Sequence, residues 1–266
     1  MDDLRPTIVK LGGSIITRKR ETERTRPKVL ERLGRELGGL SLPGGLLVLH
    51  GAGSFGHPGA QRFGLARPPA PDARPELRRR GGAIVGREVR RLHNDVLRAL
   101  IDGGAPAFST PPNVLARNRE GRLASLEDRP IRRALEEGRV PVAFGDVVPD
   151  DAWGVSILSA DTLALELGRR WSARRVVFVS DVPGILPPGA SGRQHPIPRW
   201  NREEQARLDP LPGAPDVTGG IRAKGQAMLD LAAAGVPAGI VSGLRPGATA
   251  GALRSEDYVG GTWALP

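Results

Sequence analysis

Short uninterrupted runs of apolar residues alternate with longer amphipathic stretches along the whole chain. Apolar runs at 7–13, 46–51, 140–148 and 175–186 are predicted as buried strands, and the amphipathic stretches 28–37, 76–101 and 159–170 as helices. Continuous apolar strands separated by helices are typical of a parallel sheet covered on both faces. The pattern therefore predicts an α/β fold, with proline- and glycine-rich loops at 67–75 and 187–198.

Polar and glycine residues follow several of these predicted strands. In parallel sheets, ligands bind beyond the carboxyl ends of the strands. That edge should gather the residues that come directly after each strand: Gly12, Gly13, Ser14, the stretch 51–57, Gly145, Asp146 and Asp181. Ser159 is a predicted N-cap, which places Asp161 in the first turn of the helix that follows.

The composition sets limits on the class of protein. The length of 266 residues is compatible with one large domain or two fused lobes. The absence of cysteine excludes disulfides and thiolate zinc sites, and the N-terminus lacks the apolar region of a secretory signal. No apolar run approaches the ~18 residues that a membrane span requires. We therefore expect a cytoplasmic protein without a membrane partner.

The net charge of +10 raises the possibility of nucleic-acid binding. The arginines, however, occur as short pairs and triplets such as Arg78 to Arg80, beside acidic residues in helical stretches, and they are expected on solvated helix faces. Few aromatic residues are available for base stacking. Only four of the 39 basic residues are lysines, namely Lys10, Lys19, Lys28 and Lys224. Lysine offers a compact point charge suited to a transferring phosphoryl group. The lysines are therefore candidates for catalysis, and no nucleic-acid partner is expected.

The predicted strand at 46–51 leads into a glycine-rich turn that carries two of the four histidines, His50 and His57. Backbone N–H groups in such a turn, together with a helix N-terminus, favour an anion. His57 is the predicted ligand of that anion, and His50 is expected to make a buried structural hydrogen bond. His93 and His195 are predicted to be ordinary surface residues.

Six segments occur in the order seen in the amino acid kinase superfamily: "VKLGGSIITRK" from Val9, "HGAGSFGHP" from His50, "FGDVV" from Phe144, "SADTLA" from Ser159, "SDVPGIL" from Ser180 and "DVTGGIRAK" from Asp216. The second and last resemble the isopentenyl phosphate kinases in particular. The resemblance implies an open αβα sandwich with a mainly parallel central sheet. It also implies an acceptor-binding lobe at 1–150, an ATP-binding lobe at 151–266 and a homodimer.

The resemblance also implies roles for individual residues. The catalytic set would be Lys10, Lys19, His57, Asp161 and Lys224, in which Asp161 orients Lys10 and Lys224. The acceptor would contact Ala52, Gly53, His57, Gly145, Asp146, Ser159 and Ala160. ATP would contact Lys10, Gly12, Gly13, Ser14, Gly53, Asp181, Gly184, Gly220 and Lys224. No carboxylate cluster is visible in the sequence, so no residue is predicted to bind a metal, and Mg²⁺ would be held by ATP oxygens and water.

The activity implied by this resemblance is ATP-dependent phosphorylation of isopentenyl phosphate to isopentenyl diphosphate, a step of isoprenoid biosynthesis by an alternative mevalonate route. A phosphate monoester is largely dianionic at neutral pH, because its second pKa is about 6, so the acceptor needs no catalytic base. The alternatives are a fosfomycin-type kinase, a kinase of another small alkyl phosphate, and a nucleotide sensor or nucleic-acid-binding protein on the same fold. An apolar pocket would favour a prenyl group and a polar one fosfomycin.

Two positions depart from the expected pattern. Ala160 stands where the isopentenyl phosphate kinases are expected to have glycine, which affects a contact to the acceptor. The second departure is in the long helix, where bulky aromatic residues are expected and the chain has Gly81, Gly82, Ala83 and Gly86. A cavity lined by such small residues is either deeper or filled from elsewhere. Our hypothesis is a pocket that accepts chains of more than five carbons.

Overall fold

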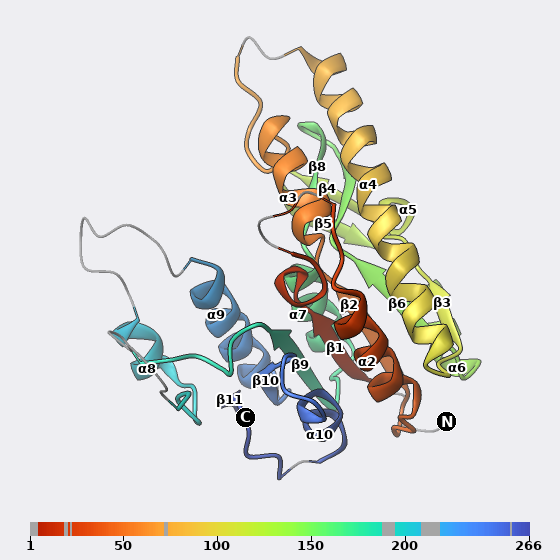
Figure 1. Ribbon diagram of the computed structural model, residues 1–266. Helices are drawn as coiled ribbons and strands as arrows, with labels where there is room; N and C mark the ends of the chain where they lie inside the picture. The colour runs from red at the N-terminus through yellow and green to blue at the C-terminus, as the bar shows by residue number, and fades with distance from the viewer. Residues whose placement is uncertain are drawn as a thin grey trace.

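A seven-stranded sheet forms the centre of the protein in the computed structural model, which describes residues 5–18, 21, 23–71, 74–187, 195–208, 219–255 and 257–266 (Figure 1). Its strands are parallel except for the strand at Thr262–Ala264, which runs antiparallel to its neighbour. The strand order is β11 (Thr262–Ala264), β10 (Ala238–Ser242), β9 (Arg175–Ser180), β1 (Thr7–Leu11), β2 (Leu46–His50), β6 (Val140–Phe144) and β3 (Ala107–Ser109). The predicted mainly parallel α/β sheet is confirmed.

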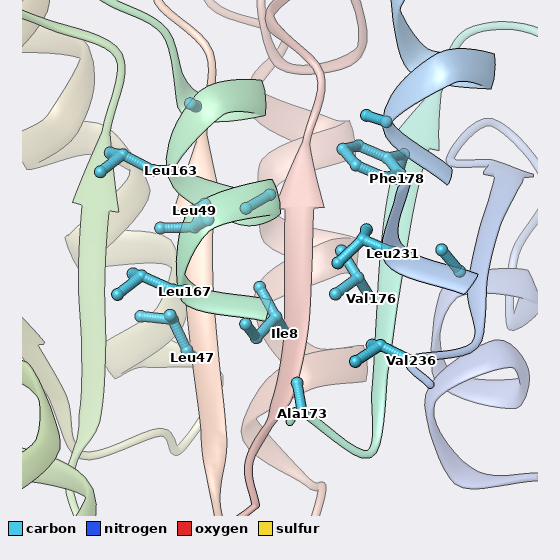
Figure 2. Close-up of a cluster of buried hydrophobic side chains, with 14 of the residues drawn as sticks. Ile8, Leu47, Leu49, Leu163, Leu167, Ala173, Val176, Phe178, Leu231 and Val236 are labelled. Atoms are coloured by element: carbon cyan, nitrogen blue, oxygen red, sulfur yellow. The ribbon is translucent and has the colours of Figure 1, made fainter. Parts of the chain in front are cut away.

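Helices cover both faces of this sheet because successive strand residues point to opposite sides. Val9 packs on one face with Leu33 and Leu92. Ile8 packs on the other face with Leu163 and Leu231 (Figure 2). The first face is covered by α1 (Gly13–Ile16), α2 (Pro27–Gly38), α4 (Pro75–Asp102) and α10 (Ala248–Arg254). The second is covered by α6 (Arg129–Glu136), α7 (Ala160–Arg170) and α9 (Gly219–Ala233). The result is a three-layered αβα sandwich.

A second sheet of four strands was not predicted. Its order is β5 (Arg122–Leu126), β4 (Ala116–Arg119), β7 (Asp146–Asp150) and β8 (Gly154–Leu158). The single strand predicted at 140–148 is therefore wrong: β6 and β7 belong to different sheets, with Gly145 between them. The break at Gly145 was not apparent in the sequence because apolar residues occur on both sides of it. In the structure β6 is almost continuously buried, whereas buried and partly buried residues alternate in β7. Likewise, β9 ends at Ser180, before the polar and proline-containing residues that follow.

The remaining helices are α3 (Gly53–Arg62), α5 (Pro112–Leu115) and α8 (Arg202–Arg207). The predicted division into two lobes at residue 150 remains a prediction. Strands from both sides of that boundary share the central sheet, and β7 pairs with β8 across it. Among the described residues, none of the helices combines the length and apolar character needed to cross a membrane.

Helices α2 and α4 approach so closely that their backbones touch. A Cβ atom on Gly34 would lie 1.9 Å from the Ala99 carbonyl oxygen, and one on Gly103 would lie 2.2 Å from the Gly34 carbonyl oxygen. We expect Gly34→Ala to force the helices apart and to lower the free energy of unfolding by about 2–3 kcal/mol. Urea denaturation followed by circular dichroism measures this change.

The matched control is Gly39→Ala, at the end of the same helix. A Cβ atom there would meet only the Arg35 carbonyl oxygen, at 3.6 Å, and the backbone φ of −85° suits alanine. Its effect should stay within about 0.5 kcal/mol. Equal losses for the two variants would contradict the packing explanation.

Candidate active site

A cleft of about 460 Å³ opens at the carboxyl ends of β1, β2, β6 and β9. Its walls are polar at the end near β1 and β9 and apolar at the end near α4. The polar lining consists of Lys10, Ser14, His57, Asp146, Ser159, Asp161, Ser180, Asp181 and Lys224, joined by backbone from Gly12, Gly13, Gly51, Ala52, Gly145, Ala160 and Gly220. The sheet edge predicted to carry the site therefore does carry a cleft, and most of the predicted residues meet in it.

The two glycine-rich turns that follow β1 and β2 are in backbone contact. A Cβ atom on Gly13 would lie 2.5 Å from the Gly53 Cα atom, and one on Gly51 would lie 2.9 Å from the Gly13 amide nitrogen. Thr17 joins the turns, since its hydroxyl donates to the Gly13 carbonyl at 2.7 Å and accepts from the Ser54 amide at 3.1 Å. Thr17 was not predicted as a site residue, because nothing in the neighbouring sequence distinguishes it from a solvent-exposed threonine.

Lys10, Asp161 and Lys224 form one ionic cluster. Lys10 lies on β1 between Leu49 and Phe178 of the neighbouring strands, and its side chain is only 6% exposed. Its Nζ atom lies 2.8 Å from Asp161 Oδ1, and Lys224 Nζ lies 3.6 Å from Asp161 Oδ2. Ser159 caps α7 as predicted, since its hydroxyl accepts from the Thr162 amide at 3.0 Å.

The charges in this cluster depend on one another. Burial lowers the pKa of Lys10, and the Asp161 carboxylate opposes this effect. Burial would raise the pKa of Asp161, but the ammonium groups of Lys10 and Lys224 outweigh it, so the pKa of Asp161 is lowered. The carboxylate therefore stays ionised between the two ammonium groups.

His57 lies in α3 and faces the cleft from the opposite side. Its ring is accessible to solvent, but the surrounding protein displaces enough water to lower its pKa, and the charges of Lys10 and Lys224 lower it further. The imidazole is therefore neutral at neutral pH and can donate one hydrogen bond into the cleft. Lys10, His57 and Lys224 thus share one cleft, as the sequence analysis required.

The carboxylate of Asp146, a predicted acceptor contact, is hydrogen-bonded by other protein groups. Its carboxylate is fully buried and accepts from Arg90 at 3.2 and 3.0 Å, from the Val147 amide at 2.8 Å and from the Asn113 amide at 3.3 Å. Burial raises its pKa, and the Arg90 guanidinium opposes that rise. The carboxylate holds the turn between the two sheets, although the residue lines the cleft.

The apolar wall of the cleft consists of Ala60, Val85, Val89, Val147 and Ile157. The glycines of α4 do not deepen it, contrary to the prediction. A Cβ atom on Gly81 would lie 2.4 Å from the Phe63 ring, and one on Gly82 would lie 3.1 Å from Val155. Gly82, Ala83 and Gly86 line a separate groove between α4 and the strands β7 and β8. Phe63 and Val155 therefore occupy the space beside Gly81 and Gly82.

Arg78 was predicted to lie on a solvated helix face and is instead buried. Its guanidinium donates to the carbonyls of Val155 at 2.9 Å, Gly64 at 2.8 Å and Leu65 at 3.1 Å. These bonds hold the segment after α3 against β8, behind the apolar wall. A signal was present in the sequence: position 78 continues the three- and four-residue spacing of the buried positions 82, 85, 89 and 92.

Some predicted site residues are not brought to the cleft wall. Gly53 is buried against Gly13 and Thr17, and Gly184 packs near Thr262 and Pro196, so neither lines the cleft. Lys19, and residues 216–218 of the "DVTGGIRAK" segment, lie outside the described residues. The roles predicted for these positions remain predictions.

The other histidines differ from expectation in one case. His50 is fully buried and makes hydrogen bonds, as predicted, whereas His93 is only 3% exposed and is not a surface residue. His50 Nε2 lies 3.1 Å from His93 Nδ1, and both rings pack on Phe144. His195 is exposed. His93 looked exposed in the sequence because charged residues flank it, but it lies one turn from the buried Val89 and Val96.

Residues 5–242 match the sequence model of the amino acid kinase family. The chain is 36% identical to the isopentenyl phosphate kinase of Methanothermobacter thermautotrophicus over 261 residues, which cover 95% of this chain and 97% of the relative. It is 34% identical to the isopentenyl phosphate kinase of Haloferax volcanii over 85% of this chain and 88% of the relative. Similarity to the acetylglutamate kinase of Brevibacillus brevis, at 32% identity, extends over 38% of this chain.

Solved structures agree with these sequence relationships. One isopentenyl phosphate kinase crystal structure superposes with a TM-score of 0.84 at 32% identity, covering 98% of this chain and 100% of the other. A substrate complex of an isopentenyl phosphate kinase superposes with a TM-score of 0.74 at 25% identity, covering 97% and 99%. The match therefore includes the whole αβα sandwich and the four-stranded sheet that the sequence analysis missed.

Proposed function

Because the chain belongs to the amino acid kinase family, and within it to the isopentenyl phosphate kinases, we propose that it transfers the γ-phosphoryl group of ATP to isopentenyl phosphate. An oxygen of the acceptor phosphate forms a bond to the γ-phosphorus, and the bond from that phosphorus to the β–γ bridging oxygen breaks. The products are isopentenyl diphosphate and ADP. The acceptor is already a dianion, so no residue has to remove a proton.

The main obstacle to this reaction is repulsion between two phosphates. A loose transition state requires alignment and neutralisation of charge rather than covalent help. Lys10 and Lys224, held together by Asp161, would neutralise the ATP phosphates, while His57 and the Ala52 amide would hold the acceptor phosphate. Lys19 would act beside them, as the family resemblance implies.

The observation that carries the choice of acceptor is the apolar wall. Ala60, Val85, Val89, Val147 and Ile157 continue directly from the anion-binding half of the cleft. A branched five-carbon chain can bury its surface there, at roughly 0.8 kcal/mol per CH₂ group. The small polar epoxide of fosfomycin gains little from such a wall, so the fosfomycin-type alternative is disfavoured.

A coupled assay for ADP release tests the proposal with Mg-ATP and four acceptors: isopentenyl phosphate, geranyl phosphate, fosfomycin and N-acetylglutamate. We expect kcat/KM for isopentenyl phosphate to exceed that for fosfomycin by about 100-fold, from three to four buried CH₂ equivalents. Geranyl phosphate should be the poorer prenyl substrate, because Phe63 and Val155 fill the space beside the α4 glycines. Equal or faster turnover of fosfomycin would contradict the proposal.

Variant Val89→Thr adds an internal control to this assay. It replaces a methyl group of the apolar wall by a hydroxyl at nearly constant volume. The KM for isopentenyl phosphate should rise while the KM for ATP stays unchanged. A parallel rise of both values would indicate a general loss of structure instead.

We further propose that the enzyme uses Mg²⁺ and works as a cytoplasmic homodimer without nucleic-acid or membrane partners. Among the described residues, no three acidic or histidine side chains gather as a metal site, so the residues suit Mg²⁺ held by ATP oxygens and water. Many arginines are paired with acidic residues on helix faces, as in Arg133–Glu137 and Arg170–Glu166. Such pairs leave less charge for polyphosphates.

A further inference from the structure

A directed chain of hydrogen bonds runs through the protein behind the cleft. His50 Nδ1 lies 3.1 Å from the Gly51 carbonyl oxygen, His50 Nε2 lies 3.1 Å from His93 Nδ1, and His93 Nε2 lies 2.7 Å from the Ser109 hydroxyl. His50 and His93 do not line the cleft. The mechanism described above uses neither of them.

The donors in this chain can be assigned from chemistry. A carbonyl oxygen only accepts, so His50 Nδ1 must carry a hydrogen. Burial lowers the pKa of His50 to about 4 and that of His93 to about 3, so both rings are neutral and each has one N–H group. His50 Nε2 therefore accepts from His93 Nδ1–H, and His93 Nε2 accepts from the Ser109 hydroxyl. In each of these hydrogen bonds the donor lies on the Ser109 side and the acceptor on the Gly51 side.

The hydrogen bond from His50 to the Gly51 carbonyl determines the direction of the Gly51–Ala52 peptide group. Gly51 donates its own N–H to the Leu11 carbonyl at 2.9 Å, and its carbonyl is held by His50. In a trans peptide the C=O and the following N–H point in opposite directions, and the described residues contain no cis peptide bond. The Ala52 N–H therefore points away from the His50 ring. Gly51 and Ala52 both line the cleft.

The Ala52 amide is also available. Within the part of the chain that the structure describes, no backbone or side-chain group accepts a hydrogen bond from it. A backbone N–H at the start of a helix, in a cleft that His57 also lines, suits an oxyanion. The Phe144 ring stacks on His50 with 5.3 Å between ring centroids, and it packs in a tilted arrangement on His93 with 4.3 Å between centroids. These contacts keep both histidine rings in place.

We propose that His50, His93 and Ser109 are positioning residues, which hold the Gly51–Ala52 peptide so that the Ala52 N–H binds the acceptor phosphate. This inference deepens the proposed function and rests on it for the identity of the acceptor. The histidines do not touch the reacting atoms. They act through one peptide group, and their effect should fall on acceptor binding rather than on ATP.

NMR spectroscopy of the histidine rings tests the geometry without any substrate. In protein labelled with ¹⁵N-histidine, multiple-bond ¹⁵N–¹H spectra distinguish the Nδ1–H from the Nε2–H tautomer, and the chain has only four histidines. We expect His50 and His93 to be neutral Nδ1–H tautomers at pH 7. An Nε2–H tautomer at either residue would overturn the proposal.

Steady-state kinetics of His93 variants test the predicted effect on acceptor binding. His93→Leu removes the donor that fixes the His50 tautomer, and the acceptor KM should rise about tenfold, as expected for one hydrogen bond to a charged group, while the ATP KM stays within about twofold. His93→Asn places an amide N–H near the former Nδ1 and should restore most of the loss. Failure of this rescue, or an equal rise of both KM values, would overturn the proposal.

A matched control separates positioning from stability. Val96→Ala lies on the same helix and is buried in a different cluster, with Leu92 and Leu100. It should lower stability and leave the acceptor KM unchanged. A rise of the acceptor KM in Val96→Ala as large as in His93→Leu would show that the histidine acts only structurally.

Inorganic phosphate distinguishes failure of this inference from failure of the proposed function. Calorimetric titration of phosphate needs no prenyl acceptor. We expect His93→Leu to weaken phosphate binding about tenfold relative to the unaltered protein, even if isopentenyl phosphate is not the substrate. Unchanged phosphate affinity would overturn the inference whatever the acceptor assay shows.

Discussion

Asp161→Asn is expected to lower kcat/KM by about 100- to 1,000-fold, the order seen when a preorganised charged group at a reaction centre is lost. The amide has nearly the shape of the carboxylate but no charge. Without that charge, burial and the neighbouring Lys224 both lower the pKa of Lys10, with nothing to oppose them. Lys10 is then expected to lose its proton more readily, and Lys224 loses the carboxylate with which it pairs.

The pH profile identifies this cause. A lysine whose pKa has fallen is charged at low pH and neutral at high pH, so the residual activity of Asp161→Asn should increase as pH falls from about 8.5 to 6.5 relative to the unaltered enzyme. Measurement of kcat/KM across this range is the test. A profile parallel to that of the unaltered enzyme would exclude the loss of charge on Lys10 as the cause.

Glu166→Gln provides the control on the same helix. Glu166 pairs with Arg170 on the surface, at 2.9 Å and 37% exposure, and does not line the cleft. Glu166→Gln changes the charge of α7 by the same amount as Asp161→Asn does. Its kcat/KM should remain within about twofold of the unaltered enzyme, since exposed pairs contribute little.

Acidification is expected to remove much of the stability of the fold between pH 6.5 and 4.5. The buried His50 and His93 have pKa values of about 4 and about 3, against about 6.5 for an unfolded histidine. Below pH 6.5 the unfolded chain takes up protons that the folded protein cannot, so stability present above that pH is lost as pH falls toward 4. At about 1.4 kcal/mol per pH unit for each group, the loss reaches about 5 kcal/mol by pH 4.5.

Urea denaturation at pH 7.5, 6.5, 5.5 and 4.5 measures this loss. Carboxylates also titrate in the lower part of the range, so the double variant His50→Leu/His93→Leu is the comparison, and its pH dependence should be flatter than that of the unaltered protein. His195→Leu, which removes an exposed histidine, should leave the dependence as it is. Equal slopes for the unaltered protein and the double variant would refute this explanation.

Much of the fold could be predicted because the strands of the central sheet are largely apolar and the helices are amphipathic. The helices predicted at 28–37, 76–101 and 159–170 correspond to α2, α4 and α7, and the cap at Ser159 is present. The four-stranded sheet could not be predicted, because its strands are short, only partly buried, and paired through contacts distant in sequence. For example, Asn118 of β4 pairs with Asp150 of β7.

The candidate site, like the fold, could be predicted only in part. Lysines are rare in this chain and occur in recognisable motifs, so their chemistry could be read directly, and the edge of a parallel sheet determines where such motifs meet. The wall of the acceptor pocket could not be read. The glycines of α4 suggested empty space, but Phe63 and Val155, which come from other elements, occupy it.

The sequence alone thus determined the chemical groups and the end of the sheet at which they gather, since local patterns and parallel topology specify both. Only the tertiary structure decided how these groups are charged, oriented and screened. The buried Arg78, the ion pair of Arg90 with Asp146, and the histidines behind Gly51 all depend on which side chains meet across elements. Burial and pairing in three dimensions change the pKa of a group and the direction of a peptide, and residue order does not specify either.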